Sequence, residues 1–273
     1  EKPTDYILGA ETPRCVVPIS KDEFLKYLPK GELQFGREDF MDCATRSPNN
    51  ALEAKLNKFV ATYPFHAFTI WLISKGYVNP QNKVELSDRF TAILSGTTRQ
   101  GNSLVAPLHT IHKTGIIPKK LLPREENMTW DEYHDKTKIT QVMLELGQES
   151  LSWIDITYWK TDLKARDDIA CTAGHAWPQP IEGVYLKTEE QFNHAFITEP
   201  QYFVFDNYEE SPDDFIKELA PNYILLAGYR IVLQLKKKLN PVEEIKEYRE
   251  ENHYIVLLKK VWEFIKSIWF YLF

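Results

Sequence analysis

Residues 193–206 read NHAFITEPQYFVFD, in which an imidazole opens one apolar run, a carboxylate ends a second, and a proline lies between them. Both runs have the β-branched and aromatic content of strands, and a three-residue loop at 199–201 joins them as a hairpin. Pairing about Pro200 places His194 opposite Asp206. Directly opposed residues share a face, with Cβ atoms roughly 4.5–5.5 Å apart. The hairpin alone therefore predicts an imidazole–carboxylate pair.

A thiol far upstream supplies a nucleophile for that pair. Cys43 lies 151 residues before His194. A thiol is a weak nucleophile until a neighbouring base holds its proton, and the base needs a third group to orient it. The order thiol, imidazole, then Asn or Asp, with the later members about 130–150 residues downstream, is typical of one class of thiol hydrolases. The sequence thus predicts a triad of Cys43, His194 and Asp206.

The rival base is His175, in the segment AGHAWP. No Asp follows it at hairpin distance, so the need for an orienting group favours His194. The other histidines fall on segments of helical type and are expected to be structural or solvated: His66, His109, His112, His134 and His253.

Composition narrows the remaining options. The 273 residues are 43% hydrophobic and 13% aromatic, which is enough for a substantial core. A net charge of −6 without a basic stripe argues against a general nucleic-acid binder. Three scattered cysteines make neither a disulfide framework nor a zinc cluster, although a bridge from Cys15 to Cys171 stays open. No metal or cofactor is expected, and neither a signal peptide nor a membrane span is seen.

Apolar periodicity changes along the chain. Helical spacing dominates the first half, and a period of two follows. The strands expected are 152–157, 169–172, 183–186, 194–198, 202–206 and 223–233. We therefore predict an α+β fold of two lobes with a cleft between them. Its parts are an N-terminal arm (1–42), a helical lobe with the nucleophile (43–128), a β-rich lobe with the His and Asp (129–236) and a tail (237–273).

Two segments near the C-terminal end are predicted to be helical. Ser211-Pro212 begins a helix in which Asp213 and Asp214 offset the helix dipole, so these acids are expected to be structural. Residues 254–273 form an amphipathic stripe that includes Trp262 and Trp269. Three roles for the stripe stay open: docking on the chain's own core, self-association into a homo-oligomer, and contact with a membrane surface.

These residues resemble the papain-like (C1-type) cysteine peptidases. The similarity lies in Asp42-Cys43 with Asn50-Ala51-Leu52-Glu53 for the nucleophile helix, Asn193-His194-Ala195 for the His strand, and Phe205-Asp206-Asn207-Tyr208 for the Asn-Ser-Trp element. Segments 87–90, 95–104 and 115–118 look like a divergent branch found in phage and environmental bacterial genomes. The resemblance implies a helical lobe, a β lobe, and cleavage of a peptide or protein substrate through a thioester acyl-enzyme. It also implies that Gln34 and the Cys43 N–H bind the oxyanion, with Tyr208 shielding the His–Asp bond.

The chain departs from the family pattern at four positions. Ala44 replaces the usual Trp, Gln34 lies nine residues before Cys43 where the family has six, and Asp206 replaces the orienting Asn. The fourth departure is Pro48. If Ser47 capped the helix and Pro48 were its first residue, Cys43 would lie before the helix and lose part of the dipole effect on a thiol.

That expectation supports an alternative hypothesis. The chain would be a catalytically impaired papain-fold protein with a structural, virion-type assembly role, and it would oligomerise through its C-terminal helix.

Overall fold

The computed structural model describes residues 19–34, 37–161, 163, 168–175, 181–186, 192–199, 203–207, 215–226 and 228–236. The predictions for the tail (237–273, with the stripe at 254–273) lie outside these residues, as do those for Cys15, Tyr208, Asp213, Asp214 and His253. Within the described ranges, none of the helices has both the length and the apolar character needed to cross a bilayer.

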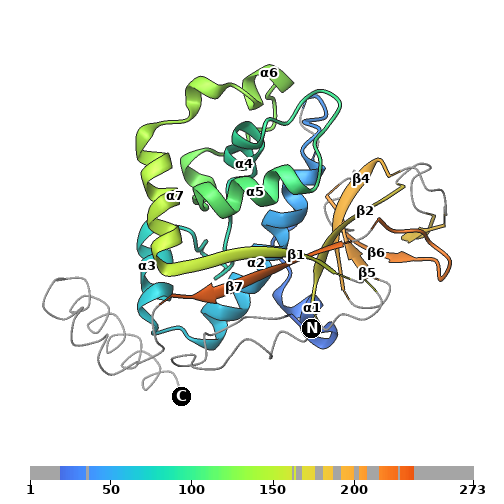
Figure 1. Ribbon diagram of the computed structural model, residues 1–273, viewed down its shortest axis with the longest axis horizontal. Coiled ribbons are helices and arrows are strands. Elements are labelled where there is room, and N and C mark those ends of the chain that lie inside the picture. The colour runs from blue at the N-terminus through green and yellow to red at the C-terminus, as the bar shows by residue number, and fades with distance from the viewer. Residues whose placement is uncertain are drawn as a thin grey trace, which may run out of the picture.

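Helices form most of the first half of the described chain (Figure 1). They are α1 (Lys21–Tyr27), α2 (Cys43–Thr62), α3 (Ala67–Lys75), α4 (Asp88–Ser95), α5 (Val105–Thr114), α6 (Trp130–Tyr133) and α7 (Gln141–Trp153), with short 3-10 turns at Lys119–Leu121 and Lys136–Lys138. Local signals set several of the ends. Ser87 caps α4 by accepting the Phe90 N–H, and Gly96, at φ 76°, ends it.

One mixed sheet follows, made of β1 (Ile154–Thr161), β2 (Ala170–Gly174), β3 (Val184–Tyr185), β4 (His194–Thr198), β5 (Phe203–Phe205), β6 (Ile216–Leu219) and β7 (Gly228–Leu235). Its strand order is β1-β7-β2-β4-β5-β6-β3. Every named pair is antiparallel except β3 with β6. The α+β prediction is therefore confirmed.

The long helix α2 joins the two kinds of structure. It packs against β4, β2 and β7 on one side and against α4 and α5 on the other, and Figure 1 shows it between the helices and the sheet. The largest apolar core includes side chains of both, such as Leu56 of α2, Ile111 of α5 and Ile197 of β4. The helical and β-rich parts therefore share a core where they meet.

The structure corrects one local prediction. A helix that begins at Ser211-Pro212 would run on through residues 215–219, but Ile216–Leu219 forms β6, with alternate side chains exposed and buried. A short polar signal was therefore extended into a longer helix than tertiary packing supports. Elsewhere a capping box at Thr129 starts α6, which ends at Tyr133, and α7 starts separately after its own cap, Thr140.

Candidate functional site

The hairpin that carries the imidazole and the carboxylate forms with a shifted register. Thr198 pairs with Val204 and Ile197 with Phe205, so the predicted pairing of His194 with Asp206 is wrong by two residues. The Glu199 N–H donates to the Phe203 carbonyl at 3.1 Å, in agreement with this shifted pairing. A shift of two preserves the face on which each side chain lies, whereas a shift of one would reverse it. His194 and Asp206 thus remain on one face as diagonal neighbours.

The two side chains are in direct contact. His194 Nε2 lies 2.5 Å from Asp206 Oδ1, and both residues are buried. The other carboxylate oxygen, Oδ2, accepts the Tyr185 hydroxyl. Asp206 is held in turn by its backbone N–H, which donates to the Phe215 carbonyl at 2.8 Å. Since Nε2 is engaged by the acid, Nδ1 is the ring nitrogen left for a nucleophile.

Cys43 is the first residue of α2, and Asp42 is its N-cap. The expectation that Cys43 precedes the helix is wrong. Pro48 lies inside α2 instead, at its sixth position, where its missing N–H removes one intrahelical hydrogen bond, the one to the carbonyl of Ala44. The thiol is therefore at the positive end of a 20-residue helix, where an anion is favoured.

A side-chain bond joins the nucleophile helix to the His strand. Ser47 Oγ donates to the Phe196 carbonyl at 2.8 Å, one helical turn after Cys43 and two residues after His194. Small buried side chains at Ala44 and Ala195 fill the interface. With little volume between helix and strand, the Cys43 side chain lies close enough to His194 to contribute to the raised pKa of the imidazole.

The electrostatic state of His194 follows from these neighbours. Burial alone would lower its pKa, but the Asp206 carboxylate and its hydrogen bond, together with Cys43, raise the pKa of His194 to about 10. The imidazole is therefore protonated at neutral pH.

A cleft of about 620 Å³ opens over this pair. Cys43 and His194 line it together with Gln34. Its apolar lining comes from Ala44, Leu104, Val105, Ala173, Ala195, Leu226 and Tyr229, and its polar lining includes Gln100, Asn102 and Asn193. The volume and the mixed lining suit a peptide segment of a few residues.

Gln34, the residue matched to the family's oxyanion donor, lies in the same cleft despite its longer spacing from Cys43. Its backbone N–H donates to the Asn207 carbonyl at 2.7 Å, which ties this loop to the strand end that carries Asp206. Its side-chain Nε2 donates to Asp39 Oδ1 at 2.7 Å. The loop thus brings the Gln34 side-chain amide to the site, with one of its N–H groups already bonded to Asp39.

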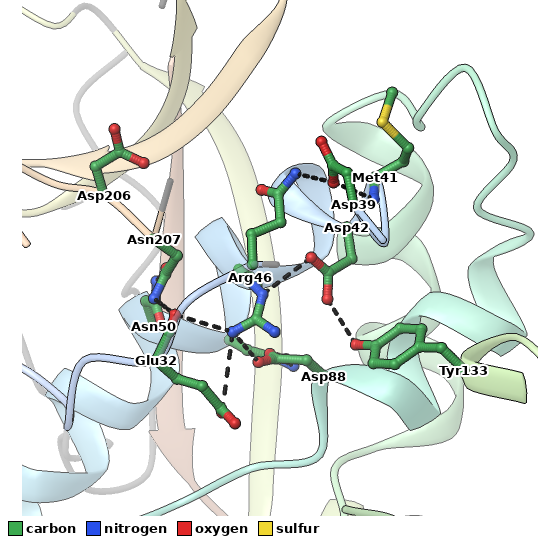
Figure 2. A network of polar contacts seen from close by, with 12 residues as sticks. Glu32, Asp39, Met41, Asp42, Arg46, Asn50, Asp88, Tyr133, Asp206 and Asn207 are labelled. Atoms are coloured by element: carbon green, nitrogen blue, oxygen red, sulfur yellow. Dashed lines mark hydrogen bonds and ion pairs between the residues drawn. The ribbon is translucent and has the colours of Figure 1, made fainter. Parts of the chain in front are cut away.

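An ion network surrounds the start of α2 (Figure 2). Arg46 contacts Asp42 at 2.9 Å and Asp88 at 3.2 Å, and Asp42 also accepts the Tyr133 hydroxyl at 2.6 Å. Burial raises the pKa of Asp88 to about 6, although Arg46 acts to lower it. Arg46 therefore compensates the charge of the buried Asp42 carboxylate, in the residue next to Cys43.

Two residues that support the site were not predicted to do so. Tyr185 bonds Asp206 from β3, and only the parallel pairing of β3 with β6 brings it there. Asn207 accepts from Asn50 Nδ2 at 2.5 Å and donates to the Glu32 carbonyl at 2.7 Å (Figure 2). Asn207 belongs to the motif Phe205-Asp206-Asn207-Tyr208, and its place in that motif could have indicated a role at the site.

The other candidate residues have separate roles. His175 follows β2, its carbonyl accepts the Tyr223 hydroxyl, and it is not among the residues that line the cleft. Cys171 is a free thiol, and burial raises its pKa to about 12. His66 caps α3 by accepting the Phe68 N–H, and His134 stacks on Trp130.

Among solved structures, the fold is similar to papain-like cysteine proteases. Xylellain, a cysteine protease from Xylella fastidiosa, shares 13% identity over 81% of this chain and 92% of its own, with a TM-score of 0.46. The Carica candamarcensis cysteine protease CMS1MS2, solved in complex with E-64, shares 11% identity over 82% and 92%, with a TM-score of 0.42. A structure from work on the mite allergens Blo t 1 and Der p 1 shares 11% identity over 86% and 74%, also with a TM-score of 0.42.

No protein-family model matches the sequence, and no curated protein sequence is similar to it.

Proposed function

We propose that the chain is a cysteine peptidase that cleaves peptide bonds in peptide or protein substrates. Cys43 is the nucleophile, His194 the general acid and base, and Asp206 the group that orients His194. Gln34 and the Cys43 backbone N–H are the oxyanion donors. We also propose that the chain belongs to the divergent branch of papain-like peptidases found in phage and environmental bacterial genomes. The sequence motifs at 87–90, 95–104 and 115–118 support this placement.

One observation carries the proposal: a buried imidazole bridges a helix-terminal thiol and a buried carboxylate at the floor of a cleft. A nucleophile held by a base, with the base held by a third group, is the geometry expected of covalent catalysis. A histidine with only a packing role would not require contact with both a thiol and a carboxylate.

The reaction follows from the roles. The Cys43 sulfur adds to the substrate carbonyl carbon, and the carbonyl electrons move to the oxygen, which the donor N–H groups stabilise. The C–N bond then breaks as His194 gives its proton to the leaving amine, and a thioester remains. Water, deprotonated by His194, adds to the thioester, and the thiolate leaves as the acid product forms.

The direct test is alkylation of the thiol with iodoacetamide at about pH 6, followed by mass mapping of the labelled cysteines. An ordinary thiol with a pKa near 8.5 is ionised to only about 0.3% there. A thiolate held by an imidazolium reacts on the order of 10²-fold faster than that. We therefore expect fast labelling at Cys43 that His194→Ala abolishes.

Cys171 is the internal control, because its buried thiol has a raised pKa and should label slowly in the folded protein. Labelling of Cys43 at the rate of free cysteine, unchanged by His194→Ala, would contradict the proposal.

Replacing Asp206 by asparagine should shift the pH dependence of hydrolysis. The Asp206 carboxylate raises the pKa of His194, so removing its charge lowers that pKa. Activity that requires the imidazolium is then lost at lower pH, and the alkaline limb of kcat/KM should move down from about pH 10 by about 1–3 units. A pH series with fluorescein-labelled casein measures this, and an unmoved limb would exclude His194 as the titrating group.

One argument for the alternative hypothesis, a catalytically impaired papain-fold assembly protein, is not supported by the structure. One of the departures behind that hypothesis was a Cys43 that lies before the helix, whereas α2 begins at Cys43. Its assembly element, the C-terminal helix, lies outside the described residues.

A further inference from the structure

The carboxylate of Asp39 lies at the edge of the cleft, four residues before Cys43. Its Oδ1 accepts two hydrogen bonds, from Gln34 Nε2 at 2.7 Å and from the Met41 N–H at 2.7 Å. Figure 2 shows Asp39 beside Met41, above the start of α2. One oxygen therefore connects the loop that carries Gln34 to the turn that leads into the nucleophile helix.

The bond to Gln34 sets the direction of its amide. A carboxylate can only accept, so it selects the NH₂ end of the amide and turns Oε1 away. Oε1 is buried and has no hydrogen-bond partner among the residues that the structure describes. Nε2 carries two N–H groups that diverge by about 120°, and the bond to Asp39 uses one of them. The second is left for an oxyanion, whereas a flipped amide would present an oxygen that repels it.

The bond to Met41 acts on the other side of the site. Met41 has φ 55°, in the left-handed region that side chains other than glycine rarely adopt. Such a conformation persists where its surroundings hold it, and Asp39 Oδ1 binds the Met41 N–H. The next residues are Asp42, the N-cap, and Cys43, whose N–H is one of the first in α2 and has no carbonyl four residues earlier inside the helix.

We propose that Asp39 is a positioning residue for the oxyanion site, a role that rests on the proposed peptidase activity. It acts through the two donors, Gln34 Nε2 and the Cys43 N–H, and does not touch the substrate itself. Its negative charge near a developing anion is unfavourable, so the benefit must come from the acceptor oxygen and not from the charge. A group that acted electrostatically would depend on its charge, whereas Asp39 depends on its acceptor oxygen.

The conservative variant tests it. Asp39→Asn keeps an acceptor oxygen and removes the charge, whereas Asp39→Ala removes both. Loss of one oxyanion donor lowers kcat by about 10²–10³-fold in other hydrolases. We expect Asp39→Ala to lower kcat for a peptide substrate by about 10²-fold with KM within about threefold, and Asp39→Asn to recover at least about tenfold of that loss.

Three comparisons complete the design. Alkylation by iodoacetamide develops no oxyanion, so the labelling rate of Cys43 should stay unchanged in Asp39→Ala. In a Gln34→Ala background, Asp39→Ala should cost much less than it does alone, because the two residues act together. Glu38→Ala removes a neighbouring carboxylate that contacts Arg99 and the Trp130 N–H, and should leave kcat within about twofold.

The outcomes are distinguishable. Fast labelling of Cys43 in the wild type together with an unimpaired Asp39→Ala would overturn the role of Asp39 alone. Equal loss in Asp39→Ala and Asp39→Asn, or labelling that falls in parallel with kcat, would also overturn it, since charge or folding would then be the cause. Slow labelling of the wild type itself would overturn the peptidase proposal and this one together.

Discussion

Replacing His194 by alanine should lower kcat/KM for peptide hydrolysis by about 10⁴–10⁶-fold, the range of losses seen when one member of a catalytic triad is removed. The imidazole holds the thiol proton and later protonates the leaving amine. His194 lies between the other two groups, Cys43 and Asp206. The measurement is steady-state hydrolysis of labelled casein, with thermal melting to show that the variant is folded.

His175→Ala is the matched control. His175 is also buried, lies one residue beyond β2, and was the rival base in the sequence. It does not line the cleft. We expect its loss of kcat/KM to be less than about tenfold. If the two variants lost equal amounts of kcat/KM at equal stability, His194 would not be the specific catalytic base.

Replacing Asp168 by alanine should lower the free energy of unfolding by about 3–5 kcal/mol, as expected when a buried ion pair loses one partner. Asp168 Oδ2 accepts from Lys55 Nζ at 2.5 Å and from Arg230 Nε at 3.1 Å. Oδ1 accepts the backbone N–H groups of Ile19 and Ile169. Without Asp168, the fully buried Lys55 loses the carboxylate that pairs with it at 2.5 Å, and two buried N–H groups lose their acceptor.

Urea unfolding measures that loss, and an exposed pair provides the control. Lys75 and Glu149 are 2.9 Å apart with about 40% of each side chain exposed. Lys75→Ala should therefore cost less than about 1 kcal/mol. If Asp168→Ala cost no more than Lys75→Ala, the buried network would contribute little to stability, in contradiction to its burial.

The sequence by itself determined the features that depend on neighbours in the chain. The caps at Ser87 and Gly96 are examples, because a capping side chain and a left-handed glycine act within one turn. The imidazole–carboxylate pair is another. Its predicted register was wrong by two residues, yet His194 and Asp206 still share a face, since only an odd shift exchanges the faces of a strand.

Only the tertiary structure decided the features that join distant segments. Cys43 approaches His194 because α2 packs on β4 through Ser47 and small side chains, and no local rule specifies that contact across 151 residues. Tyr185 reaches Asp206 through a parallel strand pair that the sequence does not encode locally. Local sequence patterns involve residues a few positions apart, whereas these contacts depend on burial and packing over the whole chain. The same balance favours a helix α2 that begins at Cys43 although it contains Pro48.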